Sequence, residues 1–101
     1  MAALEPQSDW VFDEPKNVAV ITTRQIIRDG HPILYVSHDA DDGAWQFHTG
    51  GAFATQDGMI VALHSIVELD PSVSQLADLP LGWVAQRANA TAAWERSLLD
   101  D

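Results

Sequence analysis

Two short strand-like runs separated by an acidic turn constrain the fold of this chain more than any other feature. The runs cover residues 33–38 and 44–48, and the five residues between them read Asp-Ala-Asp-Asp-Gly. Runs of this length that are bounded by Asp and Gly are typical of a β-hairpin. A four-residue loop over residues 39–42 would place Val36 opposite Trp45. This register predicts an apolar face formed by Leu34, Val36, Trp45 and Phe47, and a polar face formed by Tyr35, Ser37, Gln46 and His48.

Other short apolar runs predict the remaining strands. Residues 18–21 and 59–63 each form such a run, with turn residues nearby. Residues 82–87 and 92–96 are expected to form a final strand pair, joined by a short loop of small and polar residues.

Capping signals predict two short helical regions. Residues 22–25 and 65–68 match the capping-box pattern, in which Ser or Thr is followed three residues later by Gln or Glu. Asp70 and Pro71 fit an N-cap and a first helical position. Apolar residues at helical spacing are expected to face a sheet, and they are Ile66, Leu69, Val73 and Leu76. The sequence therefore predicts a single small α+β domain with a mostly antiparallel sheet.

The 101 residues are enough for one domain. Residues 1–17 are polar and acidic and predict an extended lead-in, although Trp10, Val11 and Phe12 interrupt it and are expected to dock on the domain. Residues 18–96 form the predicted globular domain, and residues 97–101 an acidic tail. The chain has no apolar run long enough for a membrane span and no signal-peptide pattern at its start. We therefore expect a cytoplasmic protein without a membrane partner.

Acidic residues outnumber basic ones by fifteen to five, which gives a formal net charge of −10. The excess is spread along the chain, so it predicts an acidic exterior. A surface of this sign repels phosphate backbones and disfavours nucleic acid as a partner. It favours a basic protein partner, mainly by raising the association rate. Solubility alone is the other explanation for the same charge.

The residues that most often carry chemistry are not arranged in a known catalytic or metal-binding pattern. The chain has no cysteine, and its four histidines lack the spacing that places two imidazoles on one helical face. Ser residues do not occur in a Gly-x-Ser-x-Gly elbow, and Gly50-Gly51 is not followed by the Lys of a phosphate loop. We therefore expect a protein that is not an enzyme and that uses no cofactor or metal.

Four tryptophans offer either core packing or partner contacts. Trp45 and Trp83 lie in strand-like runs and are expected in the core, whereas Trp10 and Trp94 lie near the chain ends and are candidates for an interface. Arg87 is expected to pair with a carboxylate such as Asp78. The candidate partner-binding residues are Trp10, Asp39, Asp41, Asp42, Phe53 and Trp94.

Several ordered segments resemble a bacterial family. They are 33–39 (Ile-Leu-Tyr-Val-Ser-His-Asp), 43–47 (Gly-Ala-Trp-Gln-Phe), 69–72 (Leu-Asp-Pro-Ser), 76–83 (Leu-Ala-Asp-Leu-Pro-Leu-Gly-Trp), Ala85-x-Arg87 and Trp94-Glu-Arg96. Over residues 18–96 they look like the small bacterial domains labelled immunity protein family thirty-three. The resemblance implies a binding module that neutralises a toxin by covering its surface, and the acidic charge suits a basic toxin. The alternatives are a housekeeping domain that binds another protein or a small ligand, and an enzyme or metal-binding protein.

Overall fold

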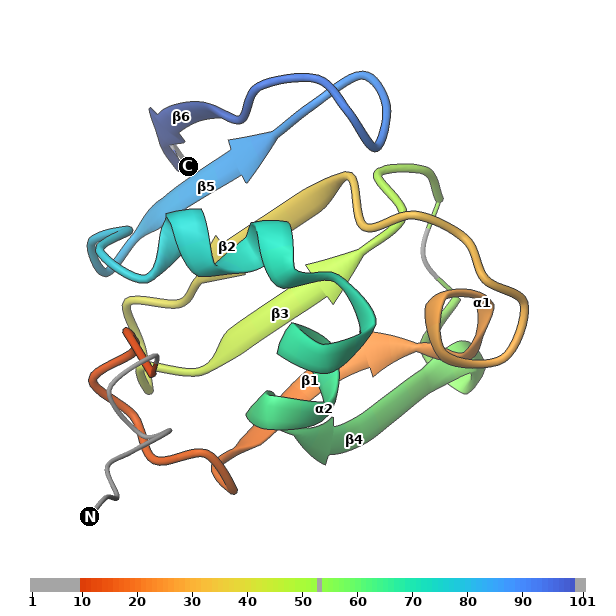
Figure 1. Ribbon diagram of the computed structural model, residues 1–101, viewed down its shortest axis with the longest axis horizontal. Helices are drawn as coiled ribbons and strands as arrows, with labels where there is room; N and C mark the ends of the chain where they lie inside the picture. The colour runs from red at the N-terminus through yellow and green to blue at the C-terminus, as the bar shows by residue number, and fades with distance from the viewer. Residues whose placement is uncertain (1–9, 53, 100–101) are drawn as a thin grey trace, which may run out of the picture.

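The computed structural model describes residues 10–52 and 54–99, and within them six strands form one sheet (Figure 1). In chain order the strands are β1 (Ala19–Thr23), β2 (Tyr35–His38), β3 (Trp45–His48), β4 (Gly58–Ala62), β5 (Trp83–Gln86) and β6 (Glu95–Leu98). Their order in space is β4-β1-β3-β2-β5-β6. Strands β1 and β3 are parallel, and the other neighbours are antiparallel. The predicted α+β class with a mostly antiparallel sheet is confirmed.

The helical segments are short. Helix α1 (Arg24–Ile27) follows β1, and α2 (Leu63–Leu69) follows β4, while the 3-10 segments are η2 (Thr55–Asp57) and η3 (Pro71–Leu76). Figure 1 shows α2 lying across one face of the sheet, which we call the helix face. Ile66, Val73 and Leu76 are buried as predicted, but Leu69 is 49% exposed. The chain leaves α2 at Asp70 and restarts as a 3-10 helix, so the predicted stripe does not continue through Leu69.

The hairpin of β2 and β3 supplies the centre of the core on the helix face. Trp45, Phe47 and Val36 are at most 1% exposed. Their side chains meet apolar residues of the helices, so the predicted division of this hairpin into a buried and a polar face is confirmed for these strands. Leu34 is an exception: it precedes β2 and is half-buried, and Ile33 takes its expected place in the core.

The predicted register of this hairpin was wrong by two residues. His38, not Val36, lies opposite Trp45, and Val36 pairs with Phe47. The loop is longer because the Asp39 amide donates to the Ala44 carbonyl oxygen, at 2.8 Å, and the Gly43 amide donates back to Asp39, at 2.9 Å. Gly43 has a φ of +74°, a value that favours glycine. A shift of two residues leaves every side chain on its predicted face because strands alternate with a period of two.

Both predicted capping boxes are wrong. Thr22 lies inside β1, and its hydroxyl donates to the carbonyl oxygen of Phe47 at 2.9 Å. The Gln25 side chain donates to Asp57 instead of returning to the helix start. Helix α2 begins at Leu63, two residues before Ser65. The predicted N-cap at Asp70 is confirmed, since the Asp70 carboxylate accepts a hydrogen bond from the Ser72 amide at 3.1 Å.

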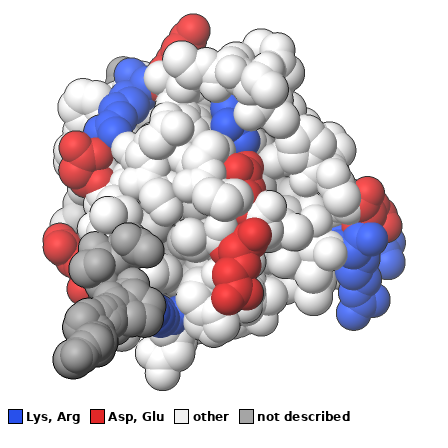
Figure 2. Space-filling model, in the orientation of Figure 1, with Lys and Arg blue, Asp and Glu red and all other residues white. Residues whose placement is uncertain are grey.

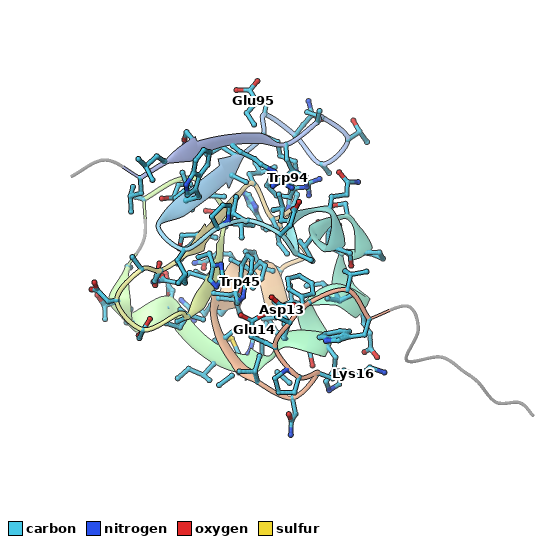
Figure 3. The ribbon with its side chains drawn as sticks, turned by 90° about the vertical axis from the view of Figure 1, so that its left-hand side faces the viewer. Asp13, Glu14, Lys16, Trp45, Trp94 and Glu95 are labelled. Carbon is cyan, nitrogen blue, oxygen red and sulfur yellow. The ribbon has the colours of Figure 1, made fainter. Side chains whose placement is uncertain are left out.

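The lead-in docks on the domain from Trp10 onward, as its aromatic residues predict. Phe12 is buried and meets Trp45 edge-on, with ring centroids 5.4 Å apart. The Trp10 indole N–H donates to the Glu14 carbonyl oxygen at 2.7 Å. Figure 3 shows the segment that carries Asp13 and Glu14 close to Trp45. At the other end of the chain, β6 begins and ends later than the predicted strand at residues 92–96.

Arg87 is buried, but its partner is Asp70 rather than the predicted Asp78. Its Nη2 lies 2.7 Å from Asp70 Oδ2, and its side chain is 2% exposed. Asp78 instead pairs with Arg96, also at 2.7 Å, on the surface. The hydrogen bond and the charge of Arg96 lower the pKa of Asp78. The prediction failed because the fold brings η3 over β5, and spacing in the chain does not reveal that.

Replacing Arg87 with Met is expected to lower the free energy of unfolding by about 3 kcal/mol, because the carboxylate of Asp70 loses its buried partner. Urea unfolding followed by tryptophan fluorescence measures the change. Arg96→Met is the matched control, since it removes a pair of equal length on the surface and should cost much less. Equal losses in the two variants would contradict the structural role of Arg87.

Thr22 and Thr23 offer a second comparison within β1. Both are buried, but within the described residues only Thr22 has a hydrogen bond from its hydroxyl. Thr22→Val should lower the free energy of unfolding by about 1 kcal/mol. Thr23→Val should lower it by less or raise it, because it removes an unpaired buried hydroxyl without changing the shape of the side chain. Chemical unfolding of the two variants tests the difference, and the reverse order would disprove it.

Candidate functional site

The predicted acidic turn lies at the end of the β2–β3 hairpin and borders a cavity of about 280 Å³. Asp39, Asp41 and Asp42 line this cavity together with residues of β5 and the segment after β6. The turn is fixed by its own hydrogen bonds, including one from the Ala44 amide to Asp42 Oδ1 at 3.0 Å. The structure therefore brings together three of the predicted partner-binding residues. We call this region the acidic site.

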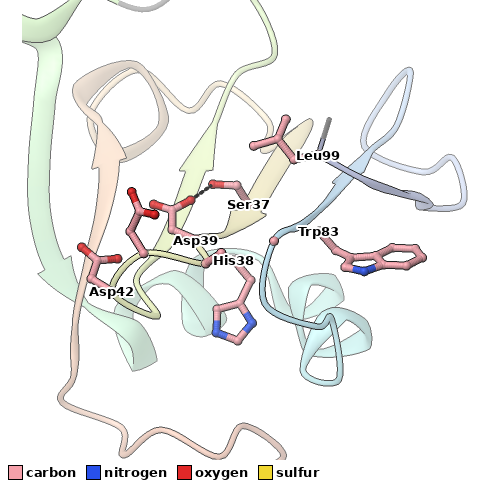
Figure 4. A pocket seen from close by; sticks show the side chains of 9 residues that line it. Ser37, His38, Asp39, Asp42, Trp83 and Leu99 are labelled. Carbon is pink, nitrogen blue, oxygen red and sulfur yellow. Dashed lines mark hydrogen bonds between the residues drawn. The ribbon is translucent and has the colours of Figure 1, made fainter. Parts of the chain in front are cut away.

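The carboxylate of Asp39 is held from two sides. The Ser37 hydroxyl donates to Oδ1 at 3.0 Å, as Figure 4 shows, and the Gln46 amide donates to Oδ2 at 2.6 Å. Gln46 in turn accepts from His48 Nε2 at 2.8 Å through its Oε1. Both neighbours donate to Asp39, so the carboxylate keeps its orientation and its negative charge remains available at the cavity.

The same network explains the titration of His48. Burial lowers the pKa of His48 below its ordinary value of 6.5, and the negative charge of Asp39 partly opposes this by raising it. A proton on Nε2 is needed for the ring to donate to Gln46. Ser37 donates to Asp39, whereas the His48 imidazole bonds to Gln46. These hydrogen bonds orient the negative charge of Asp39 at the cavity. They do not join the Ser37 hydroxyl to the His48 imidazole.

His38 lies on the other side of the strand. Figure 4 shows its imidazole and the Asp39 carboxylate pointing in opposite directions. The ring stacks on Trp45 with centroids 4.0 Å apart, and Nδ1 donates to the Leu79 carbonyl oxygen at 2.7 Å. Its Nε2 lies 3.6 Å from the Glu14 carboxylate. His38 thus contacts both the lead-in and the segment before β5, and it connects them with the strand that carries the acidic turn.

Backbone bonds join the acidic site to β5 and to the end of β6. The Gly82 amide donates to the His38 carbonyl oxygen at 2.7 Å, and the Leu99 amide donates to the Gly82 carbonyl oxygen at 2.9 Å. Gly82 has a φ of +84°. Leu99 therefore stands beside the cavity, although it is distant in the chain from the acidic turn (Figure 4).

One exposed leucine lies at the acidic site, and the sequence did not identify it. Leu99 lines the cavity and is 51% exposed. Leu98 is also exposed, but it pairs with Trp83 on the face of the sheet that carries His38, and it does not line the cavity. The sequence around Leu99 gave no signal for this role, because it arises from the antiparallel pairing of β5 with β6. The site combines three carboxylates with the apolar side chain of Leu99.

The other predicted partner-binding residues lie elsewhere. Trp10 is half-buried against the core and lies under the Lys16 ammonium, which is 5.9 Å from its ring. Trp94 is also half-buried, and the Arg87 guanidinium stacks on it at 4.0 Å. Both rings thus use part of their surface in packing within the chain. Phe53 falls outside the described residues.

The charged groups of the helix face are dispersed. Figure 2 shows acidic and basic side chains in small groups, with uncharged surface between them. Among the described residues, no three His, Asp or Glu side chains are grouped so that they could hold a metal ion. No helix in the described part of the chain is both long and apolar enough to cross a membrane.

Comparison of the chain with protein-family models, with curated proteins and with solved structures gives no match.

The coupling between Asp39 and His48 predicts a defined effect of pH. Because the pKa of His48 is lowered in the folded protein, folding disfavours protonation of this ring. The free energy of unfolding is therefore unaffected by His48 well above pH 6.5, and it decreases as the pH falls below that value. Asp39→Asn should lower the pKa of His48 further, since it removes the charge that favours the imidazolium. Titration of the His48 ring protons by NMR measures both values. An unchanged or higher pKa in the variant would contradict the coupling.

Proposed function

We propose that this chain is a cytoplasmic binding protein that covers a basic surface of a protein partner with its acidic site, in the manner of a toxin-immunity protein. The observation that carries the proposal is the placement of three carboxylates and the exposed Leu99 around one cavity. Binding, rather than catalysis, is the activity proposed.

The composition of the acidic site supports this role. Protein interfaces combine an apolar centre with a polar rim, and their energy comes from a few anchoring side chains. Leu99 offers apolar area, and the adjacent carboxylates offer acceptors for Lys or Arg side chains. A partner with a basic residue next to an apolar one would satisfy both features at once.

The geometry of Asp39 adds specificity to this proposal. Ser37 and Gln46 fix its carboxylate before any partner arrives. A fixed acceptor loses little conformational freedom when it binds a cation. The overall charge of −10 would also attract a basic partner at long range and raise the rate of encounter. The resemblance to the immunity family makes a basic toxin domain the first partner to test.

The test uses a double variant and a control that removes the same charge elsewhere. Asp41→Asn with Asp42→Asn should reduce the association rate for the basic partner by roughly tenfold at low salt, as expected for charges that steer an encounter. Asp29→Asn with Glu68→Gln removes two exposed charges away from the acidic site and should have a smaller effect. Stopped-flow binding to a basic toxin domain, sought first among the proteins encoded next to the gene, measures both rates.

Two results would overturn the proposal. One is equal slowing by the two double variants, because the site would then contribute only through net charge. The other is a toxin domain that the wild-type chain neither binds nor inhibits. Cell survival on expression of the toxin, with and without the chain, gives the second readout.

A further inference from the structure

The described helices pack on only one face of the sheet. Their buried residues all belong to the core of the helix face. The apolar side chains of the opposite face, which we call the open face, are absent from that core among the described residues. Ile21 and Ile60 are examples: they pair across β1 and β4, and Ile60 is 73% exposed. The open face is therefore available to another molecule.

The acidic site is continuous with the open face. The Asp39 side chain points away from His38, whose ring stacks on Trp45 in the core (Figure 4). Alternation along β2 then places Asp39, Ser37 and Tyr35 together on the open face. Asp39 and Tyr35 are four residues apart, which is about 13 Å of extended chain. The acidic site thus lies at one end of this face, and Tyr35 lies toward the other end.

A second cavity, of about 260 Å³, lies at the Tyr35 end of the open face. It is lined by Tyr35, His48, Gly50 and Gly51, and we call it the aromatic hollow. The two rings are paired across β2 and β3, with centroids 6.2 Å apart. Burial lowers the pKa of His48, which favours its neutral form. The described lining contains no Asp, Glu, Lys or Arg, so the hollow suits an uncharged group.

The size of an ordinary protein interface connects the two cavities. A stable complex buries about 800 Å² on each partner, which is the area of a disc with a radius of about 16 Å. A disc of that size centred on the acidic site reaches the aromatic hollow. On the opposite side of β2, the Glu14 carboxylate and the Leu79 carbonyl oxygen already contact His38. A partner seated on the acidic site therefore extends over the open face.

Resting on the proposed function, we infer that the basic partner of the acidic site has a second anchor, an aromatic side chain that enters the aromatic hollow. Aromatic rings are common among the few side chains that dominate binding energy, and they pack well against the rings of Tyr35 and His48. The surface that fits this face carries a basic side chain and an aromatic side chain about 13 Å apart.

Gly51 allows the hollow to be filled without strain. Its φ is not positive, and the nearest described atom to an added Cβ would be Thr49 Oγ1, at 3.8 Å. Gly51→Leu should leave the free energy of unfolding nearly unchanged in urea. It should raise the rate at which the basic toxin domain dissociates by roughly tenfold, because the partner loses one anchor. Gln75→Leu is the matched control, since it adds an exposed leucine on η3 and should leave this rate unchanged.

Salt separates the two anchors. Tyr35→Ala should raise the dissociation rate by a similar factor at low and high salt, because the lost contact is uncharged. The slower association of the Asp41→Asn, Asp42→Asn double variant should instead approach the wild-type rate as salt is added. In the complex, NMR cross-saturation from the toxin domain should reach the Tyr35 ring and spare the exposed methyl groups of Leu69 on α2.

The second anchor and the proposed function can fail separately. If Gly51→Leu and Tyr35→Ala leave dissociation unchanged while the aspartate double variant slows association, the second anchor is overturned and the proposed function stands. Equal effects of Gly51→Leu and Gln75→Leu also overturn the second anchor. A wild-type chain that binds no basic toxin domain overturns both.

Discussion

The buried guanidinium of Arg87 holds together parts of the chain that no continuous element connects. Its Nε donates to the Ile33 carbonyl oxygen at 3.0 Å, and its Nη2 binds Asp70 at 2.7 Å. Nη1 donates to Ser72, and the face of the group stacks on Trp94. The approach to β2, the start of η3 and the β5–β6 loop therefore meet at one side chain. The planar fork of an arginine provides these several donors at fixed angles, and a lysine would not.

Arg87 follows one end of β5, and the other end of the same strand borders the acidic site. Strand β5 lies between β2 and β6, and its position brings Gly82 to His38 and Leu99 to Gly82. His38 adds a second connection by stacking on Trp45 and donating to the carbonyl of Leu79. The acidic turn is thus supported from the core side by apolar packing and from the neighbouring strand by backbone bonds. These contacts place the carboxylates of the turn beside Leu99 at the cavity.

Local sequence patterns predicted the structure correctly where the immediate surroundings of a single side chain decide it. The two faces of the β2–β3 hairpin follow from alternation, and Asp70 caps η3 because its carboxylate reaches an amide two residues ahead. The predicted capping box at Thr22 is wrong because Thr22 lies within strand β1, where its hydroxyl donates to the Phe47 carbonyl oxygen. The acidic turn was found from its composition. The place of Leu99 at the cavity and the bond from Arg87 to Asp70 required the strand order, which no local pattern contains.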